Sequence, residues 1–399
     1  MGGGNHLMTN EDAFNSTIHR VSRPDRHHVL LESERGGYLA RVGGECTLQN
    51  HVDDAAIWDV ADGGFRHVTS GALVAAGSVA LNAPTTVDGD GTSGTPCVPR
   101  HGPAELPSSY LATMREQGWV ALPSVLSPET VEALERVGCT GPWSDQQQTS
   151  RHSLNQDPAV ARATIEPVSL WVTRQYMGTD DIRFGHPPTV SAMTPDDGER
   201  SVQGWHSDFP YLWGIPDTVG GNRVPTGSGE LVLGVQRNIC VSDFRAENGA
   251  TVFKLGSHAL QQCPPEEWGL FSATYKAGHR AKHGLPYGGP ETDVIEAPGG
   301  SILLYDARTW HRAGVNRTNE RRGAILQVLI PSYIIPFVDN SEHLLAFLET
   351  DAAAELNARE LGEISRLMTQ QIVGPQGTFA IGINEAATRR MRDAVTASG

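Results

Sequence analysis

The stretch Gly204-Trp-His-Ser-Asp-Phe209 carries a histidine and an aspartate two residues apart, His206 and Asp208. In an extended segment, residues i and i+2 point to the same face, so the imidazole and the carboxylate should project together. The spacing therefore predicts two metal ligands that face the interior of a β-barrel. A second histidine from a distant strand would complete the two-histidine, one-carboxylate set that holds non-haem Fe(II) and leaves positions open.

A lone His-x-Asp is a weak signal, because His51-Val-Asp53 has the same spacing. The second motif differs from the first because a partner follows it. The segment Gly299–Thr318 contains an apolar run that delivers His311 just before a turn rich in glycine and asparagine. His206, Asp208 and His311 are therefore the candidate catalytic residues and metal ligands.

An arginine follows the third candidate ligand at a short distance. Arg322 stands eleven residues after His311 and precedes the apolar run Ala324–Ile330. 2-Oxoglutarate would chelate Fe(II) through its 1-carboxylate and keto oxygen and supply electrons for O2. Its far carboxylate needs a fixed, charged, bidentate partner, which a guanidinium provides. We expect Arg322 to be that partner, and we expect Arg321 to be exposed on the opposite face of the strand.

Strand-like apolar runs dominate the chain from about residue 165 to residue 335, and loops rich in glycine and proline separate them. The runs are Val168–Val172, Leu231–Val235, Ala250–Leu255, Ser301–Tyr305 and Ala324–Ile330. Many short strands of this kind are typical of an all-β barrel or jelly roll. We therefore expect a mainly β fold with flanking helices.

Helices are predicted on both sides of this β region. The apolar spacing before Gly118 predicts a helix that ends there, and a short strand, Trp119–Pro123, follows. Ser127-Pro-Glu begins a second helix, which ends at Gly138. From Ser341 onward, apolar residues recur at helical steps, and we interpret this tail as helices packed on the barrel. These residues are Leu344, Leu348, Leu361, Ile364, Met368 and Ile372.

The N-terminal part shows a different pattern. Short alternating runs begin at Val29, Gly37, Ala56 and Gly71, and the turns between them are typical of hairpin-linked strands. The segment Val87–Pro96 is rich in turn formers and has no apolar period, so we interpret it as a linker. We therefore divide the chain into residues 1–100, an N-terminal β-rich accessory region with its linker, and residues 101–399, the barrel with its C-terminal helices.

Composition excludes several classes of protein. The 31 Lys+Arg against 46 Asp+Glu give a net charge of −15, which argues against a nucleic-acid surface. No apolar run approaches the ~20 residues that cross a membrane, and the N-terminus has no apolar signal core. Five cysteines, never in Cys-x-x-Cys spacing, indicate neither a disulfide framework nor a thiolate zinc site. We expect a cytoplasmic protein with a small-molecule substrate and no nucleic-acid or membrane partner; its oligomeric state is left open, with a homodimer as one option.

The chain resembles the phytanoyl-CoA dioxygenase (PhyH) superfamily of Fe(II)/2-oxoglutarate oxygenases. The motifs that carry the resemblance are Gln203–Asp208, Ser242–His258, and His311–Thr318 with Arg322. The resemblance implies a double-stranded β-helix (jelly roll, cupin-like), with Fe(II) held by the three candidate ligands and 2-oxoglutarate by Arg322. It also implies that Gln203 and Thr251 contact 2-oxoglutarate, because they match positions that do so in many members.

The sequence departs from the family pattern in places that spare the ligands. Leu255 stands where proline is usual before Gly-Ser-His, and Ser207 stands where glutamine or arginine is common. The segment between Asp208 and Leu231 is long, and we interpret it as a candidate lid over the iron. Aromatic residues flank the ligands and are candidate substrate contacts. They are Trp205, Phe209, Tyr211, Trp213 and Trp310.

The expected function is that of a dioxygenase of the hydroxylase type. With Fe(II), 2-oxoglutarate and O2, it would oxidise a C–H bond of a specialised metabolite and release succinate and CO2. Asp208 favours this chemistry, because related halogenases lack the carboxylate and bind chloride in its place. Two alternatives remain open at this point. One is a catalytically idle barrel that binds metal or ligand, with the N-terminal region as an interaction module; the other is a barrel that uses another divalent metal.

Overall fold

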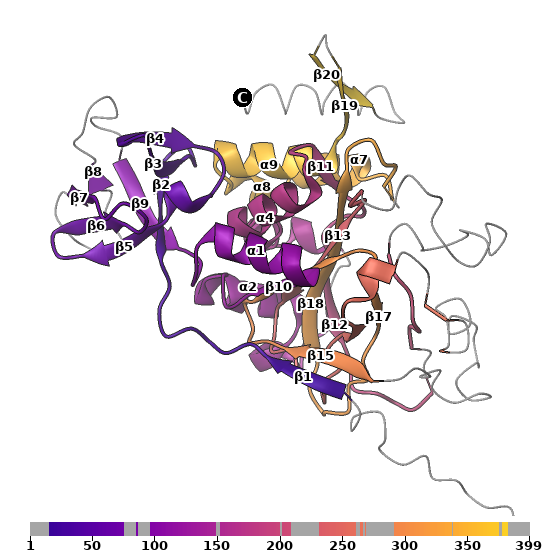
Figure 1. The fold of residues 1–399 in the computed structure, drawn as a ribbon. Coiled ribbons are helices and arrows are strands. Elements are labelled where there is room, and N and C mark those ends of the chain that lie inside the picture. Colours follow the sequence, from indigo (N-terminus) through magenta and orange to yellow (C-terminus); the bar gives the residue numbers. More distant parts are fainter. Residues whose placement is uncertain are drawn as a thin grey trace, which may run out of the picture.

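The computed structural model describes residues 16–75, 85–86, 96–148, 152–199, 202–208, 231–260, 264–265, 268, 291–336, 338–374 and 377–381. Two β-sheets lie at the centre (Figure 1). The larger sheet has the strand order β10-β16-β13-β18-β11, and β12 also pairs with β18. Its strands are β10 (Trp119–Leu122), β11 (Ile182–Phe184), β12 (Val190–Met193), β13 (Val235–Cys240), β16 (Ile302–Asp306) and β18 (Arg322–Pro331).

The smaller sheet has the strand order β1-β15-β14-β17. Its strands are β1 (Ser16–Arg20), β14 (Val252–Lys254), β15 (Thr292–Glu296) and β17 (Trp310–Arg312). Aromatic side chains from the two sheets meet between them, where the rings of Phe253 and Tyr305 lie edge to face at 5.0 Å. Such edge-to-face pairs are favourable beyond the area that they bury. This arrangement confirms the predicted mainly β jelly roll.

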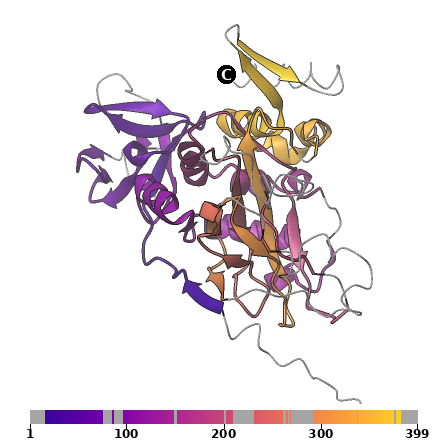
Figure 2. The ribbon, with the colours of Figure 1, turned by 45° about the vertical axis from the view of Figure 1, so that its right-hand side comes forward.

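Helices cover the face of the larger sheet that points away from the smaller one (Figure 2). They are α1 (Pro107–Gln117), α2 (Pro128–Gly138), α3 (Pro158–Thr164), α4 (Pro167–Met177), α7 (Ser341–Leu348), α8 (Asp351–Ala354) and α9 (Ala358–Met368). As predicted, α1 ends at Gly118, which has φ +76°, and the Ser127 hydroxyl caps α2 by accepting from Thr130 N at 3.3 Å. The left-handed residue after α2 is Cys139, at φ +52°, rather than Gly138. Among the described helices, none is long and apolar enough to cross a membrane.

The prediction of a strand over Val168–Val172 is wrong, because these residues lie in α4. The Glu166 carboxylate accepts hydrogen bonds from the backbone N–H groups of Val168 (3.0 Å) and Ser169 (2.6 Å), and Pro167 fits the first turn. Gly178, at φ +68°, then ends the helix.

Two further boundaries differ from the predictions. The strand expected over Leu231–Val235 begins only at Val235; residues 231–234 form an irregular segment that leads into it. Ile372, expected in a helix, lies in β19 (Gln370–Gly374), which pairs with β20 (Gly377–Ile381). The strands expected over Ala250–Leu255, Ser301–Tyr305 and Ala324–Ile330 are present as β14, β16 and β18.

The N-terminal sheet contains the predicted hairpins. Its strands are β2 (Val29–Ser33), β3 (Tyr38–Val42), β4 (Glu45–Gln49), β5 (Trp58–Ala61), β6 (Gly64–His67), β7 (Leu73–Ala75), β8 (Thr85–Thr86) and β9 (Pro96–His101). Most of the predicted linker, residues 87–95, lies outside the described residues. β1 precedes this sheet in the sequence but pairs with β15 of the smaller sheet (Figure 1). The division of the chain near residue 100 stays a prediction.

Alternation along the N-terminal strands divides their side chains between two cores. Leu31 and Leu39 are buried within the N-terminal sheet's own cluster, whereas Leu30 and Tyr38 join the core of the helical layer. Residues i and i+1 of a strand point to opposite faces, so the sheet packs on the helices with one face. One face of the N-terminal sheet therefore belongs to the same core as the helices, and the other face encloses a separate cluster.

A buried carboxylate links the N-terminal sheet to α9. Glu32 in β2 contacts Arg100 Nε (2.9 Å), Arg359 Nη2 (3.4 Å) and Asn357 Nδ2 (3.2 Å). The side chains of Glu32 and Arg359 are 6% and 8% exposed. Asn357 and Arg359 lie at the start of α9, so the carboxylate joins β2 to the C-terminal helices.

The Glu32→Ala variant is expected to lose about 3–5 kcal/mol of unfolding free energy, because it leaves Arg359 buried without its partner. Urea unfolding followed by circular dichroism would measure this loss. The exposed neighbour Glu34 is the control, and Glu34→Ala should stay within about 0.5 kcal/mol of the wild type. Equal stability of the two variants would show that the ion pair does not hold the sheet to α9.

Candidate metal centre

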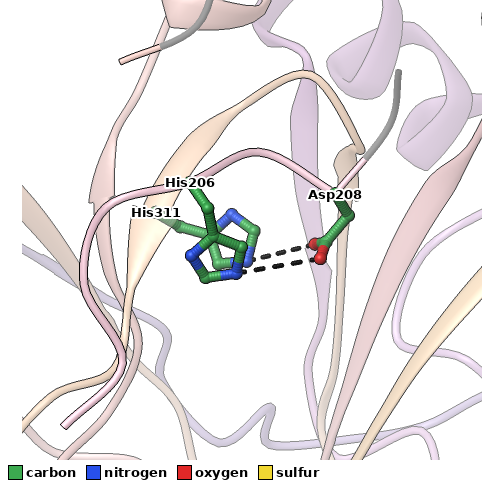
Figure 3. Close-up of side chains that lie close together, drawn as sticks. All are labelled: His206, Asp208 and His311. Carbon is green, nitrogen blue, oxygen red and sulfur yellow. Dashed lines mark ion pairs between the residues drawn. The ribbon is translucent and has the colours of Figure 1, made fainter. Parts of the chain in front are cut away.

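Three side chains meet inside the jelly roll, as Figure 3 shows. His206 Nε2 lies 3.7 Å from Asp208 Oδ1, and His311 Nε2 lies 3.1 Å from Asp208 Oδ2. All three residues are buried, and their candidate ligand atoms lie within 4.8 Å of one another. In the described part of the chain, no other group of three histidine, cysteine or acidic residues is close enough to hold a metal ion.

Backbone pairing brings the three candidate ligands together. His206 N donates to His311 O (3.0 Å) and His311 N donates to His206 O (2.8 Å), an isolated antiparallel bridge to the central residue of β17. Asp208 N donates to Ala307 O (2.9 Å), just after β16. The predicted His-x-Asp segment and the predicted His311 strand therefore lie side by side.

In each imidazole, the hydrogen bond made by the Nδ1 atom fixes the tautomer of the ring. His206 Nδ1 lies 2.8 Å from Gly204 O, and His311 Nδ1 lies 3.0 Å from Thr309 O. A carbonyl oxygen only accepts hydrogen bonds, so each Nδ1 carries the proton and each neutral ring keeps its lone pair on Nε2. Both Nε2 atoms face the Asp208 carboxylate (Figure 3). The donor set therefore fits a divalent metal, and two imidazoles with one carboxylate are the donors of non-haem Fe(II) sites.

The two imidazoles differ in their affinity for protons. Burial, together with the charge of His311, lowers the pKa of His206 to about 4. Burial also acts to lower the pKa of His311, but the adjacent Asp208 carboxylate outweighs it and raises that pKa. Burial acts to raise the pKa of Asp208, but the charge and contact of His311 outweigh burial, so the pKa of Asp208 is lowered overall. Without metal, a proton at this site resides on His311 and Asp208 stays ionised.

Metal binding is expected to release about one proton between pH 5 and 6.5. In this range His206 is already neutral and His311 is protonated, so only His311 must lose a proton to bind metal. Affinity should rise about tenfold per pH unit and level off once the pH exceeds the raised pKa of His311. Calorimetric Co²⁺ titrations in buffers of different ionisation enthalpy would count the protons. A release of two would contradict the separation of the two pKa values.

Arg322, at the start of β18, lines a nearby cavity of about 310 Å³ together with Gln203. Its guanidinium lies 4.4 Å from the Phe244 ring centroid, and Nη2 contacts Met193 Sδ at 3.5 Å. Its Nε and Nη1 atoms are buried, and neither has a hydrogen-bond partner among the described residues. Burial lowers the pKa of Arg322 to about 10, so it remains charged at neutral pH. A buried cation of this kind is suited to an anionic ligand, because unpaired burial of a charge is costly.

Arg321, which was expected to be exposed, is half-buried; it donates to Gln146 O (2.5 Å) and does not line the cavity that Arg322 lines. The other predicted site residues occupy different places. Thr251 does not line that cavity; its Oγ1 accepts from Asn238 Nδ2 at 3.1 Å. Phe209, Tyr211 and Trp213, with the candidate lid, lie outside the described residues.

The two described aromatic candidates pack against a third tryptophan. Trp205 and Trp310 lie edge to face with Trp268, at centroid distances of 5.5 and 5.4 Å. Each directly precedes a candidate histidine ligand in an extended segment, and pleat alternation therefore directs its ring away from the metal side. Both rings are buried. The structure thus brings together the three ligands, and Arg322 with Gln203, but not these aromatic rings with the ligands.

Two polar residues of β13 belong to the site's surroundings and were not predicted. The Gln236 side chain helps to lower the pKa of the Asp208 carboxylate, and Asn238 contacts Thr251 and, at 3.5 Å, the Tyr305 hydroxyl. The signal for both was present, since they occupy alternate positions of the strand Val235–Cys240, which is buried throughout. Polar residues at one face of a buried strand indicate an interior site.

Comparison with known proteins gives one family and a weak structural likeness. Residues 142–324 match the family model of phytanoyl-CoA dioxygenase (PhyH). Two solved structures of the epimerase SnoN are similar, one in complex with Fe3+, alpha ketoglutarate and nogalamycin RO and one described as a non-heme alpha ketoglutarate dependent epimerase from nogalamycin biosynthesis. Each is 17% identical and covers 57% of this chain, and the chain covers 84% and 83% of theirs, with TM-scores of 0.38 and 0.37. Similarity at this level carries no argument about the reaction.

The search against curated proteins found no relative that matches. The family match agrees with the motifs in its span, which include His206, Asp208, His311 and Arg322. It confirms the predicted resemblance. Over residues 142–324, this chain is therefore similar to the PhyH-like superfamily of Fe(II)/2-oxoglutarate oxygenases.

Proposed function

We propose that this protein is an Fe(II)- and 2-oxoglutarate-dependent dioxygenase that hydroxylates a C–H bond of a small organic molecule. One observation carries the proposal: a buried three-ligand metal centre stands in the same barrel as a buried arginine, two of whose nitrogen atoms have no hydrogen-bond partner among the described residues. The ligands account for a metal with open positions. The arginine accounts for an acidic co-substrate.

The roles of the chain's own residues follow from this geometry. His206, Asp208 and His311 would hold Fe(II), with both imidazoles oriented by backbone carbonyls. Arg322 would bind the far carboxylate of 2-oxoglutarate through its Nε and Nη1 atoms, which no other described residue contacts by a hydrogen bond, and Gln203 lines the same cavity. Bound Fe(II) would supply O2 activation, with 2-oxoglutarate as the electron donor and succinate and CO2 as its products.

The residues that line the cavity indicate which kind of substrate it could hold. Apart from Arg322, Gln203 and Asp196, they are mainly apolar, as the presence of Val202, Val315 and Leu326 illustrates. Leu326 is 42% exposed although it lies in a buried strand, so an apolar group could pack on it. Arg322 is the only basic residue among those that line this cavity in the described chain. These features support a partly apolar substrate such as a specialised metabolite rather than a highly anionic one. Its identity, like the cytoplasmic location, stays a prediction.

The proposal is tested first without substrate. Anaerobic addition of Fe(II) and 2-oxoglutarate should produce a weak visible charge-transfer band, and His206→Ala should abolish it. The absence of a band, together with unchanged 2-oxoglutarate affinity in His206→Ala, would reject the oxygenase. Screening of metabolite classes for stimulated succinate release would then identify the substrate. Chelator should abolish that release, and recovery with a divalent metal other than Fe(II) would contradict the iron assignment.

A further inference from the structure

The turn after β16 contacts two of the three candidate ligands. This 306–309 turn begins at Asp306, the last residue of the strand. Ala307 O accepts a hydrogen bond from Asp208 N (2.9 Å), and Thr309 O accepts one from His311 Nδ1 (3.0 Å). The position of the turn therefore sets both the backbone of Asp208 and the orientation of the His311 imidazole.

A buried ion pair fixes the shape of the turn. Arg308 Nε and Nη2 donate to Asp306 Oδ1 (2.9 Å) and Oδ2 (2.7 Å), and Arg308 N also donates to Oδ1 (2.9 Å). Thr309 N donates to Asp306 O at 2.9 Å. The Asp306 and Arg308 side chains are 1% and 11% exposed. A bidentate pair of this kind is strong and geometrically specific, so the turn has little freedom to move.

The helical layer holds the same carboxylate from the other side. The Tyr176 hydroxyl, in α4, donates to Asp306 Oδ2 at 2.9 Å. The backbone of the turn is also fixed, because Asp306 N donates to Gly118 O (2.9 Å) and Ala307 N donates to Gly234 O (3.1 Å). Contacts from α4, from the end of α1 and from the residue before β13 therefore converge on the turn that carries the two ligand contacts.

We propose that Asp306, Arg308 and Tyr176 form a brace that positions Asp208 and His311 for metal binding. They act as positioning residues, because their side chains hold the turn whose Ala307 and Thr309 carbonyl groups contact the ligands. This inference rests on the proposed function, since it concerns the same metal centre. It differs from a purely structural role in one respect: loss of the brace should change the geometry and affinity of the metal site in a protein that is still folded.

The test compares brace variants with a matched control in Co²⁺-substituted protein. Arg308→Ala should weaken Co²⁺ binding about 10–100-fold, the range found when residues that orient metal ligands are replaced. It should also shift the visible Co²⁺ spectrum. Arg308→Lys should partly restore the wild-type Co²⁺ affinity and spectrum. Tyr176→Phe, which removes one hydroxyl, should change the affinity and the spectrum in the same direction as Arg308→Ala, but by less. Calorimetry gives the affinity, and thermal unfolding is followed separately.

Tyr110→Phe is the control, because the Tyr110 hydroxyl in α1 accepts a hydrogen bond from Glu105 N (3.1 Å) away from the turn. It should lower the melting temperature without changing Co²⁺ affinity or spectrum. Wild-type affinity and spectrum in both Arg308→Ala and Tyr176→Phe would overturn the brace. If Arg308→Ala does not fold, Tyr176→Phe alone decides. Failure of the wild type to bind Co²⁺ would instead overturn the metal centre itself, and the brace with it.

Discussion

The His311→Ala variant is expected to bind metal far more weakly and, as a result, to lose most of any metal-dependent succinate formation. Structural zinc sites with four ligands bind with about 10–16 kcal/mol, or about 2.5–4 kcal/mol for each ligand. Removal of one of three ligands should therefore weaken Co²⁺ or anaerobic Fe(II) binding by roughly 10²–10³-fold. The variant also loses a titrating imidazole, so the release of one proton on binding should disappear. Calorimetry on wild type and variant measures both quantities.

The chain offers a close control for this experiment. His51 stands in the same His-x-Asp spacing as His206, but its Nε2 lies 3.6 Å from Asp53 in the N-terminal sheet region. Asp53 accepts hydrogen bonds from Ala55 N and Gln49 Nε2, which indicates a structural cap. His51→Ala should leave metal binding unchanged. Equal losses in His51→Ala and His311→Ala would show that the effect is not specific to the centre.

The Arg322→Met variant is expected to change co-substrate affinity and stability in opposite directions. Truncation of a buried, hydrogen-bonded charge pair costs about 2–5 kcal/mol, so 2-oxoglutarate should bind roughly 30- to several-thousand-fold more weakly. Without 2-oxoglutarate, however, the guanidinium is a buried charge, and its Nε and Nη1 atoms have no hydrogen-bond partner within the part of the chain that the structure describes. Replacement by an apolar side chain of similar length should leave the melting temperature unchanged or raise it.

Calorimetric titration of 2-oxoglutarate into the Co²⁺ form and a thermal melt of the metal-free form measure the two effects. Arg321→Met is the control, since Arg321 is adjacent in sequence but bonds to the Gln146 carbonyl. It should alter neither 2-oxoglutarate affinity nor the pH dependence of metal binding. Unchanged 2-oxoglutarate affinity in Arg322→Met would remove Arg322 from the co-substrate site.

The alternation of side chains along a strand predicts which residues of the site point to the same face. His206 and Asp208 share a face because they are two residues apart, and Arg322 shares one with Ala324 and Leu326, which line the same cavity, whereas Arg321 points to the other face. What periodicity does not give is the contact between distant backbone groups. The carbonyls of Gly204 and Thr309, which fix the imidazole tautomers, carry no side-chain signal, because any residue could supply them.

In the fold, too, signals in the neighbouring sequence predict single elements, whereas they do not predict which distant strands pair. Val168–Val172 has apolar residues at alternate positions, which suits a strand as well as a buried helix. The local signals around it, Glu166-Pro167 before and Gly178 after, favour the helix that is observed. By contrast, nothing near Ser16–Arg20 indicates that these residues pair with Thr292–Glu296. That pairing depends on the arrangement of the whole barrel.

During synthesis, β1 leaves the ribosome long before β15, the strand with which it pairs. Ser16 pairs with Thr292, 276 residues later, and translation at ~5–20 residues per second puts roughly 14–55 s between them. The strands of the N-terminal sheet pair with one another and can associate in this interval. The smaller sheet closes only when β15 and then β17 have emerged from the ribosome. The metal centre, which needs His311 from β17, is therefore among the last parts of the jelly roll to assemble.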